Sequence, residues 1–335
     1  MKKQLLLLAL AVFAGYSTLF GQTCTDGPLS PAAGTPYNYT ATVSGTGYDG
    51  TGPFTWYVTK DVDLINGVVV PNNGGEIIAS GAGSYNAPIG GANTITIEWT
   101  SQAIANNVPY YLVIKYSQTN AGTTPSCSAM NMKVWQIQPI NKFLLAVGHF
   151  AGAIGMDGVY CSADVSSAVV TPGASPTVAY VYGVNNLYAE ITASKYAGAW
   201  TPSFKITGLD AIQTIASVNW DTDPAGTFAN TTTPGAGAGE YVSSTNATAA
   251  YDGSLKIYLK VSINNNSFEN LIGETVNIAV DGIIPVTTGT PLPDVVSDTD
   301  CSPEAIFGKN TNITVNPRPT VTPDPATGNF IPKNP

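Results

Sequence analysis

The stretch Ser254–Ile263 reads SLKIYLKVSI, and apolar side chains occupy every second position from Leu255 to Ile263. A period of two is that of a β-strand with one buried face, whereas a helix would need a period near 3.6. The run Thr94–Trp99 (TITIEW) has the same alternation, and Tyr110–Tyr116 (YYLVIKY) is rich in residues that favour strands. These three runs predict an all-β protein.

Similar runs recur along both halves of the chain, separated by turn clusters such as Ser44–Gly52 (SGTGYDGTG). Two groups of about seven short strands are typical of immunoglobulin-type sandwiches. The sequence therefore predicts two tandem immunoglobulin-like β-sandwich domains. The expected strands are Tyr37–Val43, Phe54–Thr59, Gly67–Val70, Glu76–Ala79, Thr94–Trp99, Tyr110–Tyr116 and Met132–Gln138, then Thr177–Tyr182, Leu187–Ala193, Ser203–Ile206, Ala216–Trp220, Ser254–Ile263, Glu274–Val280 and Asn312–Asn316.

Charge is scarce in this chain. Of 335 residues, 13 are Lys or Arg and 22 are Asp or Glu, and the net charge is −9. The 44% apolar content argues against disorder, and 34 Gly with 24 Pro argue against a helical bundle. An acidic chain lacks the basic surface that nucleic-acid binding needs, so no nucleic acid is expected as a partner.

The chain is expected to divide into five segments. Residues 1–21 have the features of a cleaved signal peptide, with Lys2 and Lys3 before the apolar run Leu5–Phe13. The sandwiches are expected at 22–141 and 159–317, the larger second one with a long loop at 221–252, which offers room for one more edge strand. An apolar, Gly-rich linker strand is expected at 142–158, with an assembly segment as the alternative, and a Pro-rich tail at 318–335. No stretch is long enough to be a transmembrane helix.

Four cysteines follow the expected cleavage site: Cys24, Cys127, Cys161 and Cys301. An even count in an exported chain favours disulfides over metal binding or catalysis. Four cysteines can form two disulfides in three ways. The positions in the two halves favour Cys24–Cys127 and Cys161–Cys301, each closing one domain on itself.

The residues argue against an enzyme. His149 is the single histidine, and Asp157 is the nearest acid in sequence, so no triad assembles locally. Neither a GxSxG nor an SxxK pattern occurs in a strand–turn–helix context. No catalytic residues and no cofactor are therefore expected.

Three D-x-D pairs are the remaining chemical signal. Calcium favours clustered carboxylates, and extracellular modules hold it weakly. Aspartate is also a common turn residue, which explains the same pairs without a metal. The candidate calcium ligands are Asp61, Asp63, Asp221, Asp223, Asp298 and Asp300.

Five tryptophans suggest two roles. Trp56, Trp99 and Trp135 lie inside strand patterns, where a sandwich keeps its large core residues. Trp200 and Trp220 fall at the edges of expected strands. Core burial of these two is one interpretation, and an exposed platform that binds carbohydrate is the other.

The segments Leu19–Gln22 (LFGQ), Val134–Asn141 (VWQIQPIN) and Cys161–Val165 (CSADV) resemble secreted surface proteins of the Bacteroidota. The tandem strands resemble the Ig-like or PKD-like modules of adhesins and of gliding- or type IX-associated surface proteins in that phylum. The resemblance implies a structural or adhesive role and supplies no catalytic residues.

Together these features predict a secreted, non-catalytic protein of the cell surface. It is expected to act through protein–protein contacts with other surface proteins, or through self-assembly. Low charge on strand edges is the physical basis, because charged edge residues normally block edge-to-edge pairing. The alternative is a carbohydrate-binding module that uses its edge aromatics on glycans, with calcium as a stabiliser.

Overall fold

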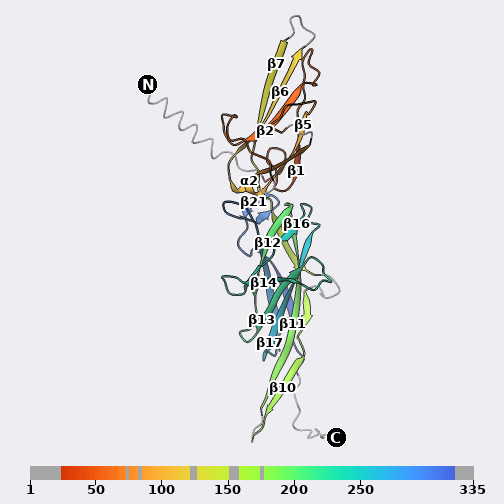
Figure 1. Cartoon of the computed structure of the whole chain (residues 1–335). Coiled ribbons are helices and arrows are strands. Elements are labelled where there is room, and N and C mark those ends of the chain that lie inside the picture. Colours follow the sequence, from red (N-terminus) through yellow and green to blue (C-terminus); the bar gives the residue numbers. More distant parts are fainter. Residues whose placement is uncertain are drawn as a thin grey trace, which may run out of the picture.

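A computed structural model describes residues 24–72, 75–81, 85–120, 127–150, 158–173 and 177–320. Strands dominate, and the described part holds one short helix, α2 (Ser101–Ala105), capped by the Thr100 side chain. The predicted all-β class is confirmed. The number of immunoglobulin-like domains stays a prediction, and the segment predicted as a signal peptide lies outside the described residues. Two groups of strands follow one another along the molecule (Figure 1).

The first group consists of two antiparallel sheets that face each other. Their strands contribute to one shared hydrophobic cluster, so the two sheets pack as a sandwich. One sheet has the order β1 (Pro36–Thr40), β5 (Thr94–Trp99), β3 (Ile77–Gly81), and the other β4 (Ile89–Gly90), β2 (Pro53–Thr59), β6 (Tyr110–Asn120), β7 (Cys127–Ile137).

Aromatic residues fill this first core as predicted. Trp56 and Trp99 are fully buried, and Trp135 is half-buried with its ring stacked 6.2 Å from that of Trp56. Each buried indole also has a hydrogen-bond acceptor, as a buried N–H requires. Trp56 Nε1 donates to the Ala92 carbonyl and Trp99 Nε1 to the Tyr39 hydroxyl, both at 3.1 Å.

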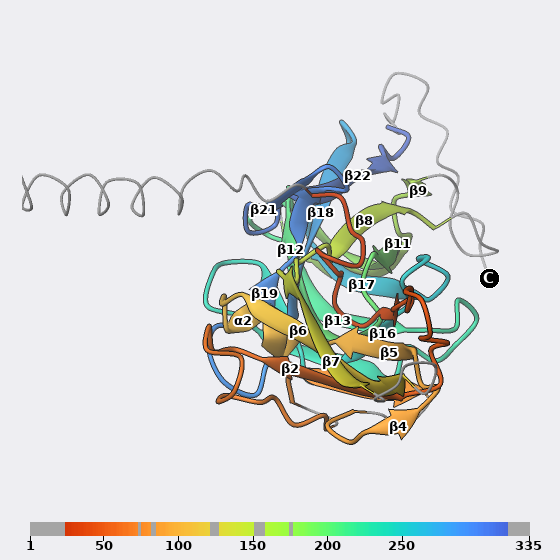
Figure 2. The ribbon, with the colours of Figure 1, turned by 90° about the horizontal axis from the view of Figure 1, so that it is seen from above.

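The second group is one sheet of 13 strands. Viewed along the long axis, it lies beneath the first group (Figure 2). The main order is β10 (Val165–Thr171), β11 (Thr177–Ser194), β17 (Lys256–Asn266), β13 (Thr214–Asp221), β14 (Asn230–Pro234), β15 (Glu240–Ser243), β12 (Gly198–Thr207), β18 (Glu274–Ile284), β22 (Lys309–Asn316), β9 (Val159–Cys161). Three more strands pair outside this order: β8 (Leu144–His149) with β11, β16 (Ala247–Ala249) with β12, and β19 (Leu292–Pro293) with β18. A separate two-stranded sheet consists of β20 (Val295–Ser297) and β21 (Asp300–Pro303).

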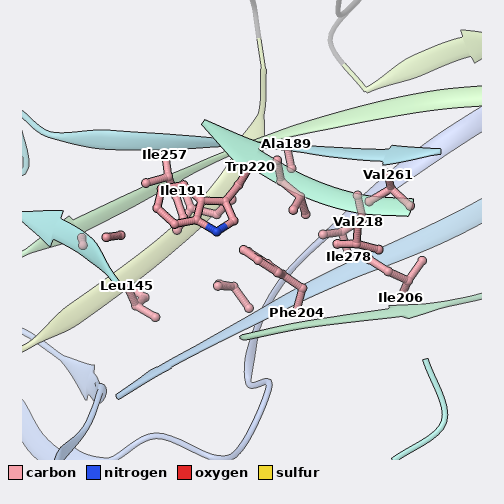
Figure 3. Packing of buried hydrophobic residues seen from close by; sticks show 14 of the residues in the cluster. Leu145, Ala189, Ile191, Phe204, Ile206, Val218, Trp220, Ile257, Val261 and Ile278 are labelled. Atoms are coloured by element: carbon pink, nitrogen blue, oxygen red, sulfur yellow. The ribbon is translucent and has the colours of Figure 1, made fainter. Parts of the chain in front are cut away.

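This large sheet encloses the main hydrophobic core. Residues of β11, β13 and β17 pack against residues of β12 and β18, so the sheet folds over itself (Figure 3). Ile191 and Ile257 approach from one side, and Phe204 and Ile278 from the other. Alternate residues point inward along each strand, as in the burial of β17, where every second side chain is buried.

Two segments that the sequence predicted as a linker and as a long loop of the second sandwich contribute strands to the large sheet. The expected linker contributes β8, which pairs with β11, and its Phe143 and Leu145 are buried. The expected long loop 221–252 contains three short strands, β14, β15 and β16, where at most one edge strand was predicted. Both segments are apolar or β-branched enough to add to an existing sheet, although neither has a clear strand period of its own.

Candidate interaction surface

A hairpin of β10 and the first part of β11 projects from one end of the molecule (Figure 1). Its strands pair from Val165 opposite Tyr182 to Thr171 opposite Thr177. Pairing of β11 with β17 begins only at Tyr182, so beyond that point the ribbon has two strands. All seven β10 residues are exposed, and so are residues 177–181 of β11. Neither face of the ribbon is covered by described parts of the chain.

The exposed surface of this hairpin is uncharged and largely apolar. Val169 is 60% exposed and Val170 is 58% exposed, and Tyr180 is also exposed. The sequence from Val165 to Ala189 contains no charged residue. A two-stranded ribbon of this kind is marginally stable alone in water, and its uncharged edge can accept another strand. These properties are those of a protein-contact surface.

The base of the hairpin is held firmly. Buried Asn185 donates from Nδ2 to the Cys161 carbonyl (2.8 Å) and accepts from the Ala163 N–H (3.2 Å). The Arg318 guanidinium lies 4.1 Å from the centre of the Tyr182 ring. These contacts anchor the ribbon to the second sheet at its base.

A second uncovered edge lies at the opposite end of the molecule, on β7 (Figure 1). Among the described strands β7 pairs only with β6, from Tyr110 opposite Ile137 to Asn120 opposite Cys127. Met130 is 74% exposed, and Met132 and Val134 on the same face are exposed as well. Lys133 is the one charged residue of the strand.

The junction between the two groups is crosslinked by a disulfide, Cys24–Cys301. The predicted pairings Cys24–Cys127 and Cys161–Cys301 are therefore wrong. Cys301 lies in β21 and is bonded to Cys24, the first residue that the structure describes. Cys161 is a free, exposed thiol, and the backbone of Cys127 opens β7 opposite Asn120. The sulfur bridge joins the two halves instead of closing each half on itself.

An ion-pair network flanks this disulfide. The buried ammonium of Lys142 lies 3.1 Å from Asp26 and 2.8 Å from Asp298, and Lys195 reaches Asp298 at 3.5 Å. Burial opposes ionisation of Asp26, but hydrogen bonds from Tyr251 and Lys142 outweigh it and lower its pKa. Hydrogen bonding to Lys142 also lowers the pKa of Asp298. The network joins the chain start, β20–β21 and the second core.

A buried carboxyl pair lies near the junction, on β18 and just after β19. Asp294 is 1% exposed, and neither of its carboxyl oxygens accepts an N–H or O–H from the described residues. Burial, together with the charge of Asp281, raises the pKa of Asp294 to about 7. Burial raises the pKa of Asp281 too. Two facing carboxyl groups can form a hydrogen bond only when one of them is protonated, so this pair retains a proton below neutral pH.

Neither tryptophan of the predicted carbohydrate platform is available to a ligand. Trp200 and Trp220 are 1% and 2% exposed. The Trp200 ring packs 5.5 Å from that of Phe143, and Trp220 Nε1 donates to the Ser243 hydroxyl at 2.8 Å. Core burial, the other interpretation of the sequence, is what the structure shows for both rings.

The D-x-D pairs act as turn acceptors or ion-pair partners. Asp63 accepts from the backbone N–H groups of Ile65 and Asn66, and Asp300 from that of Ser302. The described residues hold no group of three or more His, Cys, Asp or Glu side chains suited to a metal ion. Asp61 lies in the same turn as Asp63. Asp221 and Asp223 accept backbone N–H groups of the residues that follow β13, and Asp298 belongs to the Lys142 network.

Sequence analysis identified neither β10 nor β7 as the edge of a sheet. Val165–Thr171 was not identified as a strand, although Pro172-Gly173 between two β-branched runs is a hairpin signal. Met132–Gln138 was identified, but its position at a sheet edge depends on pairing that the sequence does not reveal. No described helix is long and apolar enough to span a bilayer.

No family model matches the chain, and no curated protein matches it. Solved structures that match include a protein from Corynebacterium diphtheriae described as membrane anchored (11% identity, 89% of this chain, 59% of that chain, TM-score 0.21). The major pilin SpaD of C. diphtheriae also matches (12% identity, 83% of this chain, 63% of that chain, TM-score 0.22). So does the E. coli adhesin CfaE (10% identity, 88% of this chain, 82% of that chain, TM-score 0.26). The chain spans less than two thirds of the first two. TM-scores this low carry no argument about fold or function.

Proposed function

We propose that this chain is a secreted, non-catalytic structural or adhesive protein of a bacterial cell surface, which acts through protein–protein contacts. The observation that carries the proposal is the β10–β11 hairpin, an uncharged ribbon exposed on both faces and projecting from a firmly held base. A free backbone edge with exposed β-branched residues is suited to strand addition by a partner. The resemblance to Bacteroidota surface modules fits the same role.

The rest of the described surface supports contact rather than chemistry. His149 Nε2 lies 2.8 Å from the Asn312 carbonyl oxygen, and no acid among the described residues bonds to it. The paired acids serve turns and ion pairs, and the aromatic rings fill cores. The disulfide and the Lys142 network hold the two halves together, so a contact at one end is mechanically connected to the other end.

The test is binding of the labelled chain to intact cells of the source bacterium. We expect Val169→Lys combined with Val170→Lys to weaken binding about tenfold or more, because charge on an edge strand opposes pairing. Ile272→Lys, at an exposed apolar residue of another loop, is the matched control and should bind like the parent chain. Protease treatment of the cells should abolish binding.

Two results would contradict the proposal. Full binding by the hairpin variant would show that the contact does not involve β10–β11. Binding that survives protease but is lost after periodate oxidation of the cells would indicate a glycan ligand instead of a protein.

A further inference from the structure

Both uncovered edges belong to the same elongated molecule and lie at its opposite ends (Figure 1). Val169 and Val170 are exposed on β10 at one end, and Met130 and Met132 on β7 at the other. Each strand is the terminal member of its sheet among the described strands. A contact that joins the two ends would therefore cover both edges at once.

We propose that the β10 edge of one copy pairs with the β7 edge of a second copy, giving head-to-tail assembly of this chain. The inference rests on the proposed function and names the partner of its contact surface. Head-to-tail contacts use two different patches, and they generate open chains where the rotation between copies does not close. Assembly of this kind builds a filament from a single protein.

Charge limits which surfaces of two copies can meet. The chain carries a net charge of −9, so contact between two copies is least opposed where their surfaces carry no negative charge. The β10 strand is uncharged, and the one charge of β7 is the positive Lys133. Pairing β7 with a second β7 would bring two copies of Lys133 together. Pairing β10 with a second β10 would leave the exposed methionines of β7 uncovered.

Strand direction is compatible with such a stack. The β10 strand runs outward, from its base at Val165 to the tip of the hairpin at Thr171. The β7 strand runs inward, because its end at Ile137 pairs with Tyr110, close to α2 at the junction. When two copies are stacked in the same orientation, both strands run the same way and would form a parallel pair, like β22 and β9 in the molecule itself.

The experiment is sedimentation of the full chain over a wide range of concentration, with variants at each edge. We expect the parent chain to form larger species as concentration rises. Val169→Lys and Met132→Lys should each weaken association about tenfold or more. An equimolar mixture of the two variants should form dimers and nothing larger, because the first keeps an intact β7 and the second an intact β10.

The Ile272→Lys variant is the control and should assemble like the parent chain. All three substituted side chains are exposed, so little loss of stability is expected, and circular dichroism checks that each variant is folded. A parent chain that stays monomeric at every concentration would overturn the inference. Normal assembly by Met132→Lys, with none by Val169→Lys, would also overturn it and indicate β10–β10 pairing.

The outcome separates this inference from the proposed function. A monomeric parent chain that still binds cells through the hairpin would leave the surface role intact and assign the edge to a different protein. An assembling chain that does not bind cells would retain head-to-tail pairing and refute the surface role.

Discussion

Replacing Cys24 and Cys301 together by serine is expected to lower the free energy of unfolding by about 5 kcal/mol. The bridge spans 277 residues, and a closed loop of that length removes much of the entropy of the unfolded chain. The two cysteines are exchanged together so that neither leaves a thiol free to form new bridges. Denaturant unfolding, followed by fluorescence of the core tryptophans, measures the loss.

Two controls isolate the effect of the bridge. Cys161→Ser changes an exposed free thiol and should leave the unfolding free energy unchanged. Adding a reductant should bring the parent chain down to the level of the double variant. Equal stability of the parent and the double variant under oxidising conditions would mean that Cys24 and Cys301 are not bonded.

The second large effect is expected from Asp294→Asn, and it depends on pH. Burial raises the pKa of Asp294 to about 7, whereas an unfolded aspartate titrates near about 4. Between these values the folded chain holds a proton that the unfolded chain has lost. The contribution of Asp294 to the stability of the parent therefore falls as the pH rises from about 4 to about 7 and is level above, a total of about 4 kcal/mol.

Asparagine cannot ionise, so the variant should not show this fall. The change in unfolding free energy from pH 4 to pH 8 is compared between the two chains. It should be more favourable for the variant than for the parent by several kcal/mol. Asp281→Asn should give a smaller fall than the parent, because the Asp281 charge is a secondary cause of the raised pKa. Asp300→Asn, at the exposed first residue of β21, is the control, and it should retain the full fall. Identical slopes for parent and Asp294→Asn would refute the shared proton.

Strand periodicity predicted most of the fold. The run Tyr110–Tyr116 lies within β6 and Ser254–Ile263 overlaps β17, because each buries alternate side chains against a core. The errors have a common physical origin. Segment 142–158 was predicted as a linker and segment 221–252 as a long loop of the second sandwich, yet they provide Phe143 against Trp200 and Ser243 against Trp220. Once those segments join the sheet, both indoles are buried.

The disulfide and the edges depend on long-range contacts. Cys24 pairs across 277 residues, and spacing along the chain gives no measure of which strands lie together. The burial of Asp294 depends likewise on β18 and β19 meeting. A strand in the middle of a sheet and one at its edge have similar sequences, so the exposed edges of β7 and β10 could be identified only from the fold.

The β10 edge is the proposed contact surface of this chain. Hydrogen–deuterium exchange of the chain, free and bound to cell envelopes of the source bacterium, measures whether this edge is covered on binding. We expect slower exchange on binding in Val165–Thr171, with the strands of the two cores unchanged. Unchanged exchange in β10, with protection elsewhere, would contradict it.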